Sequence, residues 1–158
     1  MADPFDEQMR DYTFGGIDGI TVSLALLSGL VASKKVRNVI ILGGLLSTLS
    51  GAMSMGLGDY LAIDSVKDRK DTASVSGLRV FAGYAFASSI PLLAYLFFAD
   101  IKYAFKVSVT MSFIALIIFG YIRGHLFGDD ILSSVAKTVS IGLITFGLTY
   151  QVSNNIPI

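Results

Sequence analysis

Two carboxylates and a pair of methionines stand inside otherwise apolar stretches of this sequence. Asp18 lies in the stretch YTFGGIDGITVSLALLSGLVAS, and Asp59 follows Met53 and Met55 in the stretch VIILGGLLSTLSGAMSMGLGDYLAID. A carboxylate inside a membrane-spanning helix is costly and is usually kept for a purpose. Carboxylate oxygen combined with thioether sulfur suits divalent first-row metals such as Fe²⁺ or Mn²⁺ better than Mg²⁺ or Ca²⁺. These four residues are therefore the candidate lining of a cation path.

Each of these residues also has a purely structural interpretation. Met55 and Asp59 are four residues apart and share one helix face, but Met55 could be flexible packing filler and Asp59 could reach the lipid headgroups. Asp18 could be the N-cap of a helix. If the helix instead begins near Tyr12, Asp18 lies about 9 Å inside it. Local sequence leaves these alternatives open.

The second stretch is also rich in small residues. In lipid, small residues at a spacing of four let another backbone approach closely. This pattern predicts that the second helix packs tightly through Ser47, Gly51, Ser54 and Gly58.

Composition indicates an integral membrane protein. Of the 158 residues, 53% are apolar and 15% are charged, whereas soluble domains carry about 25% charged residues. The formal net charge of zero gives no reason to expect a nucleic-acid partner. The sequence has no Lys-Ser/Thr phosphate loop and no G-x-S-x-G elbow, so we expect neither an enzyme nor a permanently bound cofactor.

Apolar runs of bilayer length predict an all-α membrane domain over residues 12–158, preceded by a polar cytoplasmic segment at residues 1–11. The charged connection at 65–77 separates the second and third spans. The five helices are expected at about 12–33, 39–64, 78–99, 103–122 and 131–152.

Five spans place the two termini on opposite sides of the membrane. The side of the N-terminus receives seven of the 12 Lys and Arg residues, which favours a cytoplasmic N-terminus. The first helix then leaves the cytoplasmic side and the second returns to it. Asp18 and Asp59 are therefore expected at similar depth near the cytoplasmic end, with Met55 about 6 Å deeper.

Three motifs resemble those of the vacuolar iron transporter family. They are DGITVSLALLSGL from Asp18, SGAMSMGLGDYLA from Ser50 and FGYIRG from Phe119. The resemblance covers residues 15–150, and its most specific part is the glycine, serine and methionine run that closes on an acid and a tyrosine.

The resemblance implies a five-helix protomer that forms a homodimer, with an ion path between the copies lined by the first and second helices. It implies exchange of Fe²⁺ or a related divalent metal for protons, and we expect export of Fe²⁺ or Mn²⁺ from the cytoplasm. Asp18 matches the family's metal-binding, proton-coupled aspartate, and Met55 matches its methionine ligand. Asp59 stands where many prokaryotic members have glutamate, whereas Met53 stands at a usually apolar position. We expect a prokaryotic cell membrane as its location.

Two departures distinguish this chain from members with an established transport role. Those members often carry an acid at the position of Ser47, and they insert a long cytoplasmic metal-binding domain where this chain has only residues 65–77. A non-transporting membrane scaffold and a passive divalent-cation channel are therefore the alternative functions.

Overall fold

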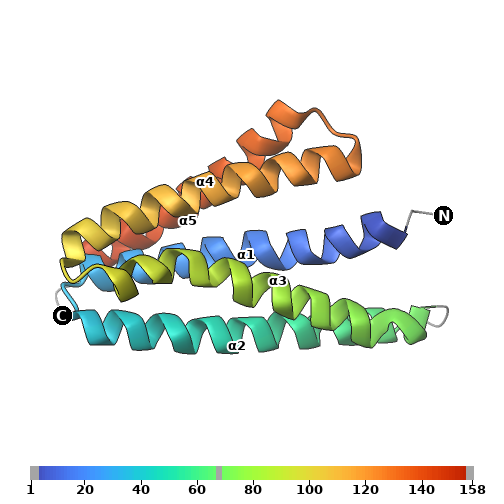
Figure 1. The fold of residues 1–158 in the computed structure, drawn as a ribbon, viewed down its shortest axis with the longest axis horizontal. Coiled ribbons are helices and arrows are strands. Elements are labelled where there is room, and N and C mark those ends of the chain that lie inside the picture. The colour runs from blue at the N-terminus through green and yellow to red at the C-terminus, as the bar shows by residue number, and fades with distance from the viewer. Residues whose placement is uncertain (1–3, 67–68, 156–158) are drawn as a thin grey trace.

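Five long helices run the length of the molecule in alternating directions (Figure 1). The structure is a computed structural model and describes residues 4–66 and 69–155. The helices are α1 (Pro4–Ala32), α2 (Arg37–Asp64), α3 (Lys70–Phe97), α4 (Ile101–Phe127) and α5 (Ile131–Asn155). Each is long and apolar enough to cross a membrane, which confirms the predicted all-α membrane fold.

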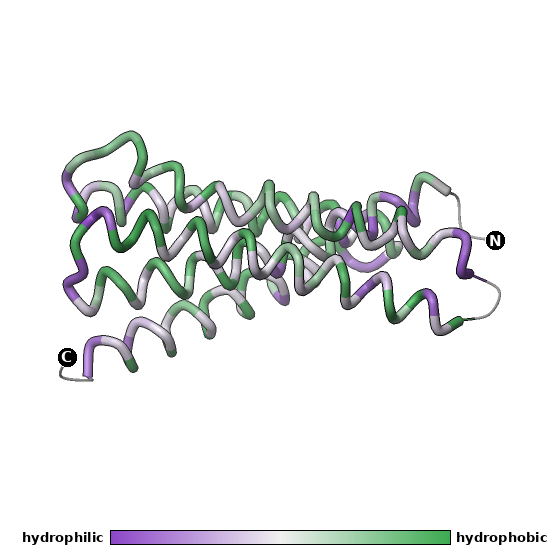
Figure 2. The backbone as a smooth tube through the Cα atoms, turned by 90° about the horizontal axis from the view of Figure 1, so that it is seen from below, coloured by the Kyte–Doolittle hydropathy of each residue, from purple (hydrophilic) through white to green (hydrophobic). Residues whose placement is uncertain are grey.

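The distribution of hydropathy along the bundle matches this membrane assignment. Hydrophilic segments gather toward the two ends of the molecule, and hydrophobic segments lie between them (Figure 2). Because α1 begins at the opposite end of the bundle from the end of α5 (Figure 1), the odd number of spans places the two ends of the chain on opposite sides.

Several helices extend beyond the spans expected from hydropathy. α1 begins at Pro4 rather than near residue 12, and α3 begins at Lys70 rather than near residue 78. Most of the polar segment 1–11 is therefore the first part of a helix, and most of the expected connection at 65–77 belongs to α3. Hydropathy detects only the apolar part of a helix, which lies in the lipid. The backbone hydrogen bonds of the helix continue beyond that part, through charged residues in water.

The early start of α1 decides between the two interpretations of Asp18. Asp18 lies fourteen positions after Pro4 in the same helix, which places it roughly 21 Å along the helix axis. Asp18 is therefore an interior residue and not an N-cap. That capping role belongs to Asp100 and Asp130, whose side chains accept from the backbone N–H of Lys102 at 2.9 Å and of Ser133 at 2.7 Å.

The helices form two groups that diverge at one end of the molecule. α1, α2 and α3 pack along most of their length, and the α4–α5 hairpin leans away from α1 toward the end where α1 begins (Figure 1). Two clusters of buried apolar side chains join the groups, and their fully buried members include Leu27, Ile40, Tyr95 and Ala104 in one and Ile20, Ala87 and Leu116 in the other.

Candidate functional site

Close packing of α1 on α3 sets the direction in which Asp18 points. A methyl group on Gly19 would lie 2.6 Å from the carbonyl oxygen of Tyr84 on α3, and one on Gly15 would overlap the carbonyl oxygen of Val80. Only glycine allows the two backbones to approach this closely. The glycine face of α1 is thus fixed against α3, and the neighbouring Asp18 is turned toward the space beside α4 and α5.

That space is a cavity of about 680 Å³. Asp18 lines it from α1, together with apolar side chains that include Phe14 and Ile17. Asp59 lines the same cavity from α2. The structure therefore brings together the two acids that topology alone placed at similar depth.

Asp59 carries an atom without a partner. Its Oδ2 is buried and has no hydrogen-bond partner among the described residues. A buried oxygen that is left unsatisfied is costly, so this atom is a free acceptor for a cation, a water molecule or a proton.

Asp11 is a third acid in the cavity and is not among the candidate residues predicted from the sequence. Its side chain is only 2% exposed. It accepts a hydrogen bond from Ser76 on α3 at 2.9 Å and lies 3.7 Å from the guanidinium of Arg79 and 3.2 Å from that of Arg10. The spacing of seven residues from Asp18 places both acids on one face of α1, two turns apart. This spacing is the sequence signal from which Asp11 could have been predicted.

Three cationic side chains also line the cavity: Arg10, Arg123 and Lys137. Arg123 on α4 donates to the hydroxyl of Ser134 on α5 at 3.4 Å and lies over the ring of Phe127. The three cations share the cavity with the carboxylates of Asp11, Asp18 and Asp59. The described lining therefore has as many basic as acidic side chains. From the sequence, Arg123 and Lys137 are only two of the seven basic residues expected on the side of the membrane that holds the N-terminus.

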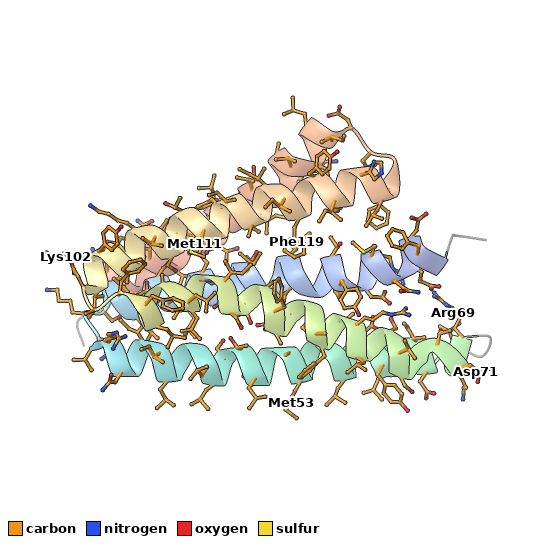
Figure 3. The ribbon with its side chains drawn as sticks, viewed as in Figure 1. Met53, Arg69, Asp71, Lys102, Met111 and Phe119 are labelled. Carbon is orange, nitrogen blue, oxygen red and sulfur yellow. The ribbon has the colours of Figure 1, made fainter. Side chains whose placement is uncertain are left out.

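The two candidate methionines lie in different places. Met55 is half-buried on α2, one turn from Asp59, and is not part of the cavity lining. Met53 points away from the bundle on the outer side of α2 (Figure 3) and lines a separate cavity of about 410 Å³ between α2 and α3. By helix register Met55 lies on the same face of α2 as Asp59, whereas Met53 lies beside the separate cavity.

The predicted small-residue stripe of α2 has two different environments. Gly51 accommodates the phenol ring of Tyr84, because a methyl group there would overlap this ring. Ser47 is half-buried, whereas Ser54 is exposed and a methyl group added to Gly58 would have no atom of the described residues within 4 Å. Within one chain, only part of the stripe is used for packing.

One copy of the chain offers an incomplete set of hard ligands. Within residues 4–66 and 69–155, no group of three or more His, Cys, Asp or Glu side chains is arranged to hold a metal ion. The cavity can supply carboxylate oxygens from two helices, but further ligands must come from solvent, from thioether sulfur or from another chain.

Comparison with known proteins identifies the family of this chain. The model of the VIT family matches residues 9–74 and 66–154. The chain belongs to the VIT family. This VIT chain is 26% identical to a protein named vacuolar iron transporter 1 of Oryza sativa subsp. japonica, over 91% of the chain and 83% of that protein. It is also 26% identical to vacuolar iron transporter 1 of Arabidopsis thaliana, over 87% of the chain and 82% of the relative.

The VIT chain is shorter than these two relatives in its aligned region. The alignment with the rice protein spans 210 residues, more than the 158 residues of the chain. A protein named vacuolar iron transporter homolog 5 of rice aligns over only 160 residues, at 26% identity and over 90% of the chain and 77% of that protein. The two segments that match the family model overlap at residues 66–74. This overlap lies within residues 65–77, the connection at which the sequence predicts that the long cytoplasmic insert is absent from this chain.

Proposed function

We propose that this chain transports a divalent transition metal, Fe²⁺ or Mn²⁺, across a membrane in exchange for protons. The meeting of Asp18 and Asp59 in one cavity carries the proposal. The two acids come from different spanning helices, and the relatives of the chain include proteins named as iron transporters. Ionisable residues inside spanning helices mark ion pathways and proton relays.

The chemistry of exchange follows from the carboxylates. A carboxylate can hold a proton or a cation, and it cannot hold both favourably. Loading of Asp18 with metal on one side and with a proton on the other would couple the two fluxes. The free Oδ2 of Asp59 is a second oxygen for the same ion, and Met55, one turn along α2, offers a sulfur ligand that favours Fe²⁺ over harder ions.

A homodimer would complete the set of ligands. One copy lacks a group of three hard-ligand side chains in its described residues. Two copies related by a two-fold axis would present two Asp18 and two Met55 side chains to a shared path. The exposed small residues of α2, Ser54 and Gly58, are suited to close approach of another helix.

Orientation decides the direction of transport. The bias of basic residues supports a cytoplasmic N-terminus, which places the open end of the cavity between α1 and the α4–α5 hairpin on the cytoplasmic side. The metal then enters from the cytoplasm and leaves across the membrane, and we propose a prokaryotic cell membrane as the location.

Uptake of Fe²⁺ and Mn²⁺ by reconstituted vesicles tests the proposal. The protein is purified and inserted into liposomes that contain a metal-sensitive dye, with and without a pH gradient. We expect metal uptake that accelerates with an opposing proton gradient. Asp18→Ala is expected to lower the uptake rate to that of protein-free vesicles, because it removes the carboxylate that alternates between the two cations.

Asp129→Ala is the matched control, because Asp129 is an exposed acid in the turn between α4 and α5 and does not line the cavity. Its uptake is expected to equal that of the wild type. Uptake without any response to the pH gradient would indicate a passive channel, and no uptake by well-folded wild-type protein would indicate a scaffold. Unchanged uptake in Asp18→Ala would exclude the mechanism.

A further inference from the structure

Two cations on the α4–α5 side of the cavity have no carboxylate beside them. Arg123 lines the cavity from α4, and Lys137 lines it from α5. Among the residues that the structure describes, neither side chain forms an ion pair. Arg10, the third cation of the lining, lies 3.2 Å from Asp11 and 3.9 Å from Glu7. The positive charge that is left without a counter-charge is therefore that of the α4–α5 hairpin.

The packing of α4 against α5 holds the two cations near each other. A methyl group on Gly124 would lie 3.1 Å from the Cα of Ile131, so the hairpin is closely packed beside Arg123. The guanidinium of Arg123 donates to the hydroxyl of Ser134 at 3.4 Å, and Ser134 lies one turn before Lys137 on α5. Like charges on neighbouring turns repel each other, and a cation inside a spanning helix is costly without a partner. This pair of cations therefore requires an anion.

The acids of the same cavity belong to its other side. Asp18 lies on α1 and Asp59 lies on α2, and neither forms an ion pair with the two cations within the described chain. The α4–α5 hairpin leans away from α1 toward this end of the molecule (Figure 1). The cavity thus has an acidic side and a basic side, and the basic side is the one that can receive an anion.

Exposed apolar side chains border the two cations. Phe14, Phe127 and Ile141 line the same cavity, and each is more than half exposed. The centre of the Phe127 ring lies 5.9 Å from the guanidinium carbon of Arg123, and Ile141 lies one turn after Lys137 on α5. An inorganic anion gains nothing from an apolar surface, whereas a phospholipid presents a phosphate and acyl chains together. Basic pockets between spanning helices on the cytoplasmic side are suited to anionic headgroups.

We infer that the basic side of this cavity binds an anionic phospholipid, whose phosphate is held by Arg123 and Lys137 and whose acyl chains lie along Phe127 and Ile141. The inference goes beyond metal transport, because it concerns the α4–α5 hairpin and not Asp18. A bound lipid neutralises two cations that would otherwise repel a divalent metal from the cavity.

Binding of phosphatidylglycerol to the purified protein tests this inference. Native mass spectrometry in detergent gives an apparent Kd for the first bound lipid, and phosphatidylcholine, whose headgroup has no net charge, is measured in parallel. We expect phosphatidylglycerol to bind more tightly than phosphatidylcholine. Lys137→Gln should raise the apparent Kd for phosphatidylglycerol by about five- to tenfold, the scale of one charge-assisted contact. Lys137→Arg keeps the positive charge and should bind as the wild type does.

Lys106→Gln is the matched control. Lys106 is an exposed lysine five positions after the start of α4, as Lys137 is an exposed lysine six positions after the start of α5, but Lys106 does not line the cavity. Its replacement should leave the binding of phosphatidylglycerol unchanged. An equal loss in Lys106→Gln would show that both lysines only extend to the headgroups at the membrane surface, and this result would overturn the inference. Because both lysines are exposed, the two Gln variants should melt at the wild-type temperature in lipid-free detergent.

Inorganic phosphate distinguishes a lipid site from a site for a free anion. Phosphate added in large excess should not displace the bound phosphatidylglycerol. Displacement by phosphate, or equally tight binding of phosphatidylcholine, would overturn the inference. Because this readout needs no metal, a failure of vesicle uptake would contradict the proposed function without altering the result for the lipid.

Discussion

At the scale of the residue, the acids that line the cavity differ in their hydrogen-bond partners, and Asp59 and Asp11 show the contrast. Asp59 has a buried oxygen with no hydrogen-bond partner in the described part of the chain, whereas Asp11 is surrounded by Ser76, Arg79 and Arg10. A satisfied, buried carboxylate stabilises the fold, and an unsatisfied one is free to bind. Asp11 therefore belongs to the packing of α1 on α3, and Asp18 and Asp59 remain the acids that we propose to receive an ion.

Met55→Leu tests the role of sulfur in metal selection. Leucine keeps the apolar volume to a good approximation and removes the thioether. We expect the apparent affinity for Fe²⁺ to fall by about tenfold, the equivalent of roughly 1.4 kcal/mol, while competition by Ca²⁺ is unchanged. Dye-based uptake in vesicles with a series of competing ions measures both quantities.

Met53→Leu is the comparison for this experiment. Met53 is 49% exposed and lies in the separate cavity between α2 and α3, so its replacement should leave the selectivity between Fe²⁺ and Ca²⁺ unaltered. Equal losses in both methionine variants would show that the position of the sulfur does not matter, contrary to the proposed path.

At the scale of the element, the contact between α1 and α3 is set by glycine. Gly15 and Gly19 on α1 and Gly83 on α3 bring the two backbones together, and a methyl group on Gly83 would lie 3.0 Å from the Cα of Tyr12. Backbone atoms cannot move aside as the end of a flexible side chain can. The position of Asp18 thus depends on residues that have no side chain.

Gly83→Ala is expected to destabilise the protein by about 1–3 kcal/mol, the usual cost of overpacking a tight contact. Gly147→Ala on α5 is the control, because no atom of residues 4–66 and 69–155 lies within 4 Å of the added methyl group. The control should be neutral or slightly stabilising, since alanine is the better helix former. Thermal unfolding in detergent, followed by circular dichroism at 222 nm, measures both effects. Equal melting temperatures for the two variants would show that the contact between α1 and α3 has room for a methyl group at Gly83.

At the scale of the whole molecule, a large part of the surface of α2 is apolar and unpartnered. Leu42, Leu46, Leu49 and Leu57 are each more than half exposed, which suits lipid or a second copy. The exposed Ser54 and Gly58 interrupt this surface with small residues, where another helix could approach closely.

Gly58→Leu tests whether that approach occurs. If a second copy packs on α2 at this point, the bulky side chain should shift the protein from dimer toward monomer in size-exclusion chromatography with light scattering. Gly147→Leu is the control, because its position on α5 is equally open. A dimer that survives Gly58→Leu would place the interface elsewhere, and a wild-type monomer would contradict the shared path.

The sequence by itself determined the number, type and order of the helices. A membrane imposes one dominant requirement on a spanning helix, which is an apolar run of sufficient length. Such a run can be recognised in the local sequence without knowledge of the tertiary structure. It also set the similar depth of Asp18 and Asp59, because alternate spans must return to the same side. The ends of α1 and α3 were not predictable in this way, since their charged first turns lie outside the part of the helix that hydropathy detects.

Only the tertiary structure decided which side chains face the cavity. Asp11 and Lys137 are brought to the cavity by the rotation of each helix about its axis. For α1, that rotation is set by glycine contacts between distant segments, such as the contact of Gly19 with Tyr84. The hydrophobic pattern does not specify this rotation, because in lipid both the buried and the exposed faces of a helix are apolar. The position of a residue in its span thus predicts its depth in the membrane, and the packing of helix on helix decides the direction in which its side chain points.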